Sequence, residues 1–162
     1  MVKPITTTIV IFIFMLAVSF TIPRPADEAV PYPEGFRKWT HIKTGLIGPN
    51  SAAFKTTGGF HHIYANSKAM EGYASGHFPQ GSIFVFDVIE GTETNGNTIE
   101  GKRTHIDVMV KDSLKYTSTG GWGYEEFKGN SKTERVLTET VRSACFKCHT
   151  QQNDYIFSDL RD

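Results

Sequence analysis

The stretch SIFVFDVIEGTETNGNTIEGKRTHIDVMVKDS, residues 82–113, decides the fold. Its first part, residues 82–91, is nearly all β-branched or aromatic, which is typical of a strand that is buried on both faces. The TNGN segment at residues 94–97 is a turn signal. After it, apolar residues alternate with the other residues over 105–111, which is the period of two that characterises a β-strand. The stretch therefore predicts two successive strands.

Further strand-like segments lie on both sides of this stretch. One or two helical turns are expected at residues 67–76, before a glycine, and only residues 131–149 predict a substantial helix. Ser131 begins an S-x-x-E capping box, which favours a helix start there. We therefore expect an α+β fold, mainly an antiparallel β-sheet with a C-terminal helix. The additional strands are expected within residues 36–48, 58–66 and 120–127.

The end of the predicted helix carries the only two cysteines of the chain, Cys145 and Cys148, and His149 follows them directly. This C-x-x-C-H pattern is what a covalently attached c-type haem requires. The two thiols are expected on the apolar face of the helix, where they can bond to the two vinyl groups on one edge of the porphyrin. The imidazole can then bind the iron as the proximal ligand. The pattern indicates a haem-bearing helix with one covalently attached haem c.

Other interpretations of the cysteine pair each lack a feature that such a site requires. A zinc site needs further ligands, and the chain has no second cysteine pair. A thioredoxin-like disulfide is expected between an early strand and a helix, not near the end of the chain. Met70 and Met109 are candidates for a thioether sixth ligand, although a methionine among apolar neighbours usually fills a core. The remaining histidines His41, His77 and His105 have no partner arrangement that suggests a metal site.

The N-terminal segment differs from the rest of the chain. Lys3 precedes an unbroken apolar run at residues 9–18, which is typical of a secretory signal peptide and short for a membrane span. We expect a signal peptide, or an uncleaved membrane anchor, at residues 1–25 and a single domain at 26–162, exported to the periplasm. Lysine plus arginine equals aspartate plus glutamate at 17 each, so nothing suggests a nucleic-acid partner.

An ordered series of motifs covers nearly all of the chain after this segment. The motifs are YPEGFRKWTHI (32–42), HHIYAN (61–66), FPQGSIFVFD (78–87), VMVKDS (108–113), GGWGYEEF (120–127) and ACFKCH (144–149). Together they resemble the cytochrome P-460 and cytochrome c′-beta family. The resemblance implies a small antiparallel β-fold, commonly a homodimer, with a solvent-protected distal haem face. Cytochromes P-460 carry a lysine bonded to the porphyrin and oxidise hydroxylamine, whereas cytochromes c′-beta hold five-coordinate haem under a phenylalanine and bind nitric oxide or carbon monoxide.

The resemblance also assigns candidate distal residues. Phe86 stands where the oxidising members have the cross-linking lysine, and a phenyl ring cannot supply an amine nitrogen. Asp107 lies on the strand where those members keep a carboxylate that accepts protons. His61 lies near the position at which those members keep a polar distal residue. From the residues alone, Asp107 either faces the pocket as a catalytic base, or faces solvent or pairs with Lys111 or Arg103.

We therefore expect an exported monohaem cytochrome that binds a small gaseous or nitrogenous ligand, as a homodimer. Its distal pocket is expected to contain Phe86, Asp107 and His61. Two alternatives stay open. One is an oxidoreductase that acts on hydroxylamine or nitric oxide with Asp107 as its catalytic residue, and the other is an electron-transfer cytochrome with a soluble redox partner.

Overall fold

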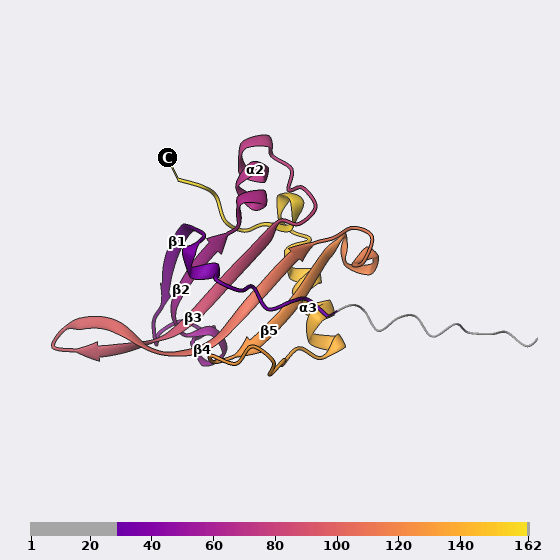
Figure 1. The fold of residues 1–162 in the computed structure, drawn as a ribbon. Helices are drawn as coiled ribbons and strands as arrows, with labels where there is room; N and C mark the ends of the chain where they lie inside the picture. Colours follow the sequence, from indigo (N-terminus) through magenta and orange to yellow (C-terminus); the bar gives the residue numbers. More distant parts are fainter. Residues whose placement is uncertain (1–28, 162) are drawn as a thin grey trace, which may run out of the picture.

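The computed structural model describes residues 29–161, which form a five-stranded antiparallel sheet with the strands in sequence order (Figure 1). Each strand pairs with its neighbour in the sequence, so the sheet is a meander. This architecture confirms the α+β fold with a mainly antiparallel sheet. The strands are β1 (Thr40–Ile47), β2 (Gly59–Ala65), β3 (Ile83–Thr94), β4 (Asn97–Lys111) and β5 (Trp122–Lys128).

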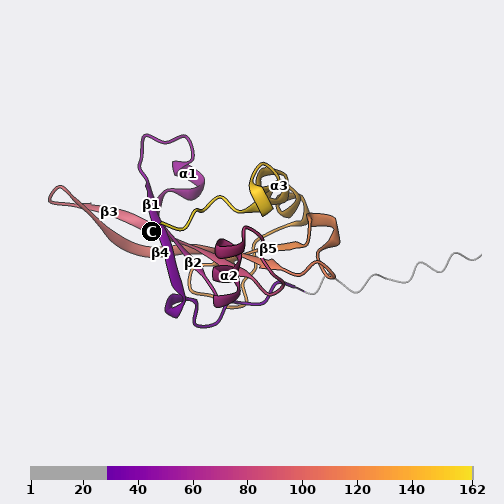
Figure 2. The same ribbon diagram turned by 90° about the horizontal axis from the view of Figure 1, so that it is seen from above.

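Short helices connect and cover the strands. Helices α1 and α3 lie on one side of the sheet, and the segment that leads into β1 lies on the other (Figure 2). The helical turns predicted at 67–76 form α2, which Gly76 ends in a left-handed conformation. The helices are α1 (Phe54–Thr57), α2 (Ser67–Ser75) and α3 (Glu139–His149), with short 3₁₀ helices at Phe36–Lys38, Thr117–Thr119 and Asn153–Tyr155.

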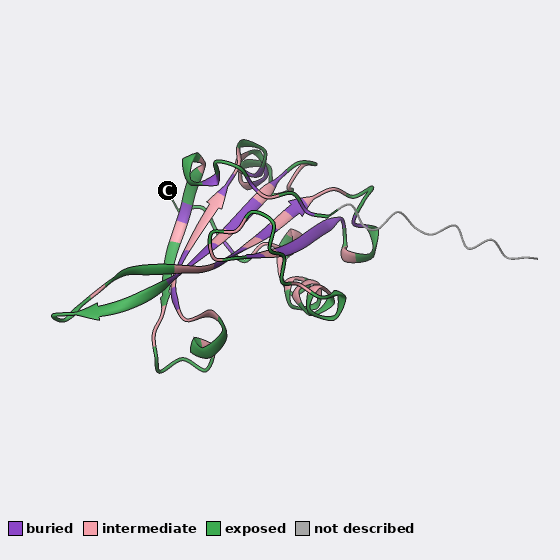
Figure 3. Cartoon of the chain, turned by 60° about the horizontal axis from the view of Figure 1, so that its bottom comes forward, coloured by how far each residue is buried: buried purple, intermediate pink, exposed green. Residues whose placement is uncertain are grey.

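The predicted turn at residues 94–97 joins β3 to β4. Asn95 and Gly96 have φ angles of 51° and 78°, and a two-residue hairpin turn of this kind needs positive φ at both positions. The two strands continue beyond the rest of the sheet as a twisted ribbon, which is mostly exposed (Figures 1 and 3). The ribbon contributes little to the core, which lies where all five strands pair.

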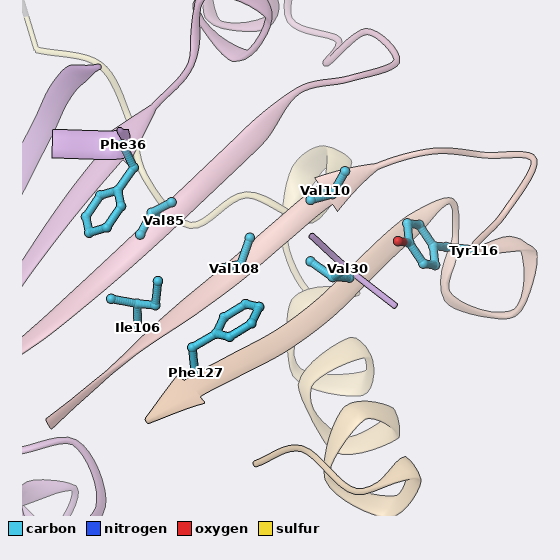
Figure 4. Packing of buried hydrophobic residues seen from close by; sticks show 8 residues of the cluster. All are labelled: Val30, Phe36, Val85, Ile106, Val108, Val110, Tyr116 and Phe127. Carbon is cyan, nitrogen blue, oxygen red and sulfur yellow. The ribbon is translucent and has the colours of Figure 1, made fainter. Parts of the chain in front are cut away.

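One face of the sheet is closed by the chain itself. Val30 and Phe36, from the segment before β1, pack on side chains of β3, β4 and β5 (Figure 4). We call this the closed face; its buried cluster is Val30, Phe36, Val85, Ile106, Val108, Val110, Tyr116 and Phe127. Because side chains alternate along a strand, the residues between these point to the opposite face.

The C-terminal helix is shorter than predicted, since α3 begins at Glu139 rather than near 131. The residues before it instead hydrogen-bond to the strand end: the Val136 amide donates to the Glu126 carbonyl at 3.0 Å. Ser131 does accept a hydrogen bond from the Glu134 amide, as a capping box requires, but there it closes only a turn. The N-cap of α3 is Thr138.

The predicted signal peptide or anchor at 1–25 lies outside the described residues, as does the start of the predicted domain 26–162. Within residues 29–161, no helix has the length and apolar character needed to cross a membrane.

Candidate functional site

A cavity of about 640 Å³ lies on the sheet face opposite the closed face. Helix α3 and the segment around α1 form its walls, and residues after the last 3₁₀ helix also line it. Thr57, Cys145 and His149 are among the wall residues. The floor is built by side chains of three strands, namely Phe84, Phe86, Asp107, Met109, Tyr124 and Glu126.

The pairing register aligns the floor residues across the sheet. Phe86 pairs with Asp107, and Asp107 pairs with Glu126, so the three side chains form one row. His61 and His105 belong to the adjacent row, one on each side of β3. The structure thus brings Phe86 and Asp107 together on the cavity floor, with His61 beside them.

His149 is held in an orientation that suits a metal ligand. Its ring nitrogen Nδ1 donates a hydrogen bond to the Tyr155 carbonyl at 2.7 Å, so the lone pair is on Nε2. The ring packs against Tyr124 and Phe157, with centroid distances of 5.4 and 4.9 Å. Burial lowers the pKa of His149, which favours the neutral imidazole that binds metals.

The two cysteines are free thiols in different surroundings. Cys145 is half-buried and lines the cavity, and burial raises the pKa of its thiol. Cys148 is exposed. Residues three apart on a helix differ by about 60° around its axis, which carries Cys148 past the edge of the packed face.

His61 lies beside the floor and is not part of the cavity lining. Its ring packs on Phe86 with a centroid distance of 4.6 Å. Its Nε2 contacts the backbone carbonyl of Thr57 and thereby ties β2 to the segment that forms one cavity wall. Burial lowers the pKa of His61, so the ring is neutral near pH 7. Its position indicates support of Phe86 and of the wall.

Asp107 pairs with neither of the cations that the sequence suggested. Arg103 bonds to Asp87 on the closed face, and Lys111 bonds to Asp154 at 3.1 Å. Asp107 instead faces the cavity, half-exposed.

Two neighbours of Asp107 were missed by sequence reasoning. His105 Nε2 lies 3.6 Å from an Asp107 carboxylate oxygen, and Glu126 lies across from it on β5. Burial raises the pKa of Glu126, and the negative charge of Asp107 raises it further. Burial lowers the pKa of His105, but the hydrogen bond and charge of Asp107 outweigh this, so the pKa lies above its usual value. The period-two alternation does place His105 with Asp107, but only the strand register adds Glu126.

The other candidates are more remote. Met109 lies on the floor between Phe84 and Tyr124. Met70 belongs to α2 and packs against the apolar cluster that joins this helix to the sheet. His41 and His77 are exposed.

A family model described as Cytochrome P460 matches residues 33–158, which include every cavity residue named above. The chain belongs to the cytochrome P460 family. It is thus a haem-binding cytochrome, as the motif series predicted. A comparison with curated proteins gave no match.

The residues of this cytochrome P460 family member fit a haem. The Nε2 lone pair of His149 is available, and Cys145 and Cys148 are free. The Tyr124 hydroxyl, which also borders the cavity, is buried without a hydrogen-bond partner among residues 29–161. An unpaired buried hydroxyl is costly, so it indicates a group that completes the cavity. Cys145, Cys148 and His149 would hold that haem.

Proposed function

We propose that this protein is an exported c-type monohaem cytochrome that binds nitric oxide or carbon monoxide. Cys145 and Cys148 would form the two thioether bonds, and His149 would bind the iron through Nε2. The observation that carries the proposal is the position of Phe86 on the cavity floor, packed against His61. Its ring has no atom that could bind the iron.

The chain shapes the cavity for a small uncharged ligand. When bound, the haem supplies a ferrous iron to which such gases bind. Phe84 and Phe86 give part of the floor an apolar surface, which disfavours water and offers no donor atom as a sixth ligand. The apolar part of the floor therefore favours small uncharged gases.

The absorption spectrum of the reduced, haem-loaded protein tests the proposal, recorded before and after addition of nitric oxide. We expect an ordinary high-spin c-type spectrum that shifts when gas is added. A low-spin, six-coordinate spectrum in both oxidation states would instead indicate an electron carrier. A strongly red-shifted ferrous Soret band would indicate a modified macrocycle and contradict the gas-binding proposal.

Two variants assign the roles of single residues. His149→Ala should retain covalently attached haem and change its axial ligation. An unchanged absorption spectrum would contradict the assignment of His149 as the iron ligand. Phe86→Ala should raise the association rate of the gas, because the ring limits access from the floor. Phe60→Ala is the matched control, because Phe60 precedes His61 on β2 and points to the other side of the sheet.

Hydroxylamine or nitric oxide oxidation is the second candidate, and the position of Asp107 in the cavity favours it. A carboxylate at this position can accept a proton from a bound substrate. Turnover of hydroxylamine with an external electron acceptor, abolished by Asp107→Asn, would support this candidate. Absence of turnover in the haem-loaded wild-type protein would exclude it.

Export and dimer formation are part of the proposal and rest on the sequence alone. Cell fractionation of the native host protein would test the periplasmic location. Sedimentation of the haem-loaded protein would test the homodimer.

A further inference from the structure

We propose that the cavity floor holds a second metal site, for a divalent first-row transition ion, formed by His105, Asp107 and Glu126. One ligand atom from each of the three residues lies within 4.8 Å of the other two. All three side chains line the cavity. The site goes beyond the gas-binding proposal, since neither the cysteine motif nor Phe86 contributes to it.

The hydrogen bonds of His105 orient its ring so that Nε2 faces the carboxylates. The Thr104 hydroxyl donates its proton to the Val88 carbonyl, at 3.1 Å. The same oxygen can therefore only accept the bond from His105 Nδ1, at 3.0 Å, so Nδ1 carries the proton. Nε2 is then the atom that faces Asp107, at 3.6 Å, and a bound metal would replace its proton. His149 is oriented in the same way, through its own Nδ1.

The two half-buried carboxylates lack the arginine partners that the buried carboxylates Asp87 and Glu125 have. No lysine or arginine within residues 29–161 lies at ion-pair distance from Asp107 or Glu126. Two neighbouring carboxylates on the cavity floor repel one another, and a bound cation would remove that repulsion. By contrast, the fully buried Asp87 is paired with Arg37 and Arg103, and the buried Glu125 with Arg135 and Arg142.

The donor set defines the class of ion. One imidazole nitrogen and two carboxylates suit Zn²⁺, Fe²⁺ or Mn²⁺, and the imidazole makes Mg²⁺ or Ca²⁺ poor occupants. Three protein ligands also leave a coordination position open, as catalytic metal sites do. The structure thus supplies a place for a second metal beside the expected haem.

Zinc is the probe for this site, in titrations of haem-loaded, chelator-treated protein by calorimetry and elemental analysis. The haem-loaded form is needed because Cys145, Cys148 and His149 would themselves bind zinc if free. We expect one zinc per haem. Glu126→Gln and Asp107→Asn should each weaken binding at least about tenfold, and Thr104→Val should weaken it through the orientation of His105.

His62→Asn is the matched control, because His62 Nε2 pairs with the exposed Glu100 at 2.8 Å and offers zinc a histidine–carboxylate pair outside the cavity. Binding that persists in His62→Asn but weakens in the two carboxylate variants supports the site. No zinc uptake, equal affinity in wild type and both carboxylate variants, or loss only in His62→Asn would overturn it. The haem spectrum of each variant reports its folding, and zinc content is read independently of gas binding, so the two proposals fail separately.

Discussion

The carbonyl oxygen of Tyr155 sets the tautomer of His149, and its position depends on an unusual piece of backbone. Asp154 and Tyr155 both have positive φ angles, 41° and 67°, which non-glycine residues rarely adopt. The Asp154 carboxylate anchors this conformation by accepting hydrogen bonds from the Phe78 amide at 2.7 Å and from Lys111 at 3.1 Å. The Asp154 carboxylate thereby helps to orient the half-buried imidazole of His149.

Asp154→Ala is expected to loosen that carbonyl. It removes both hydrogen bonds, so the free energy of unfolding should fall by about 1–3 kcal/mol. The haem-loaded variant should also show a heterogeneous axial ligand field, measured by electron paramagnetic resonance. Asp159→Ala, an exposed position nearby, should leave both properties unchanged. A loss of stability with an unaltered resonance spectrum would show that the anchor does not act on His149.

Cys145 and Cys148 should differ in thiol reactivity before haem attachment. Burial raises the pKa of Cys145, so less of it is thiolate near neutral pH, and it is also less accessible than Cys148. Alkylation with iodoacetamide at pH 7.5, followed by mass spectrometry, should modify Cys148 first. The difference should narrow as the pH rises through the pKa of Cys145. Equal rates at pH 7.5 would contradict the buried position of Cys145.

At the scale of elements, the position of α3 is set by its N-cap and by its contact with β5. Thr138 accepts a hydrogen bond from the Val141 amide at 3.3 Å, and Arg142 bonds to the Tyr124 carbonyl at 3.1 Å. The cap fixes where the helix begins, and the arginine fixes the helix on the strand. Together they bring Cys145 and His149 to the cavity.

Thr138→Ala should reduce the free energy of unfolding by about 1 kcal/mol, because it removes an N-cap hydrogen bond. Urea unfolding of the haem-free protein gives the measurement. Thr138→Ser keeps the hydroxyl and serves as the control, with a change of less than about 0.5 kcal/mol. If the alanine variant matched the wild type, α3 would not depend on this cap.

The same elements show how far the sequence alone predicts this molecule. Alternation and composition predicted all five strands, because each signal is local. The start of α3 was predicted too early, because the Val136 amide bonds to Glu126 of β5, a contact that no local pattern reveals. His105 was assigned no partner for a similar reason: its carboxylate neighbour Glu126 comes from another strand, through the register. The cysteine motif, by contrast, is continuous in sequence and was read directly.

At the scale of the whole molecule, the two faces of the sheet are closed in different ways. The closed face is covered by the segment before β1, which is held by a hydrogen bond from Arg135 to the Val30 carbonyl at 2.7 Å. Lys132 also pairs with Glu34 of that segment. The other face carries the cavity.

Val30→Ala tests whether the N-terminal segment belongs to the core. Val30 is only 3% exposed, so loss of two methyl groups should lower the free energy of unfolding by about 1–3 kcal/mol. Val136→Ala is the matched control, since Val136 is 44% exposed and should change stability by less than about 0.5 kcal/mol. Equal effects in chemical denaturation would mean that the segment only rests on the sheet.

The cavity bears on how long the haem-free protein survives in the cell. A chain that has not received its haem presents a cavity bordered by Phe84, Met109 and Tyr124, with nothing of its own to fill it. Such a chain opens more readily than the loaded one, because a ligand that binds only the folded state stabilises it. Proteases act on opened chains, so unloaded copies should be cleared and loaded copies should accumulate. The supply of haem, rather than the rate of synthesis, would then determine how much of this protein a cell maintains.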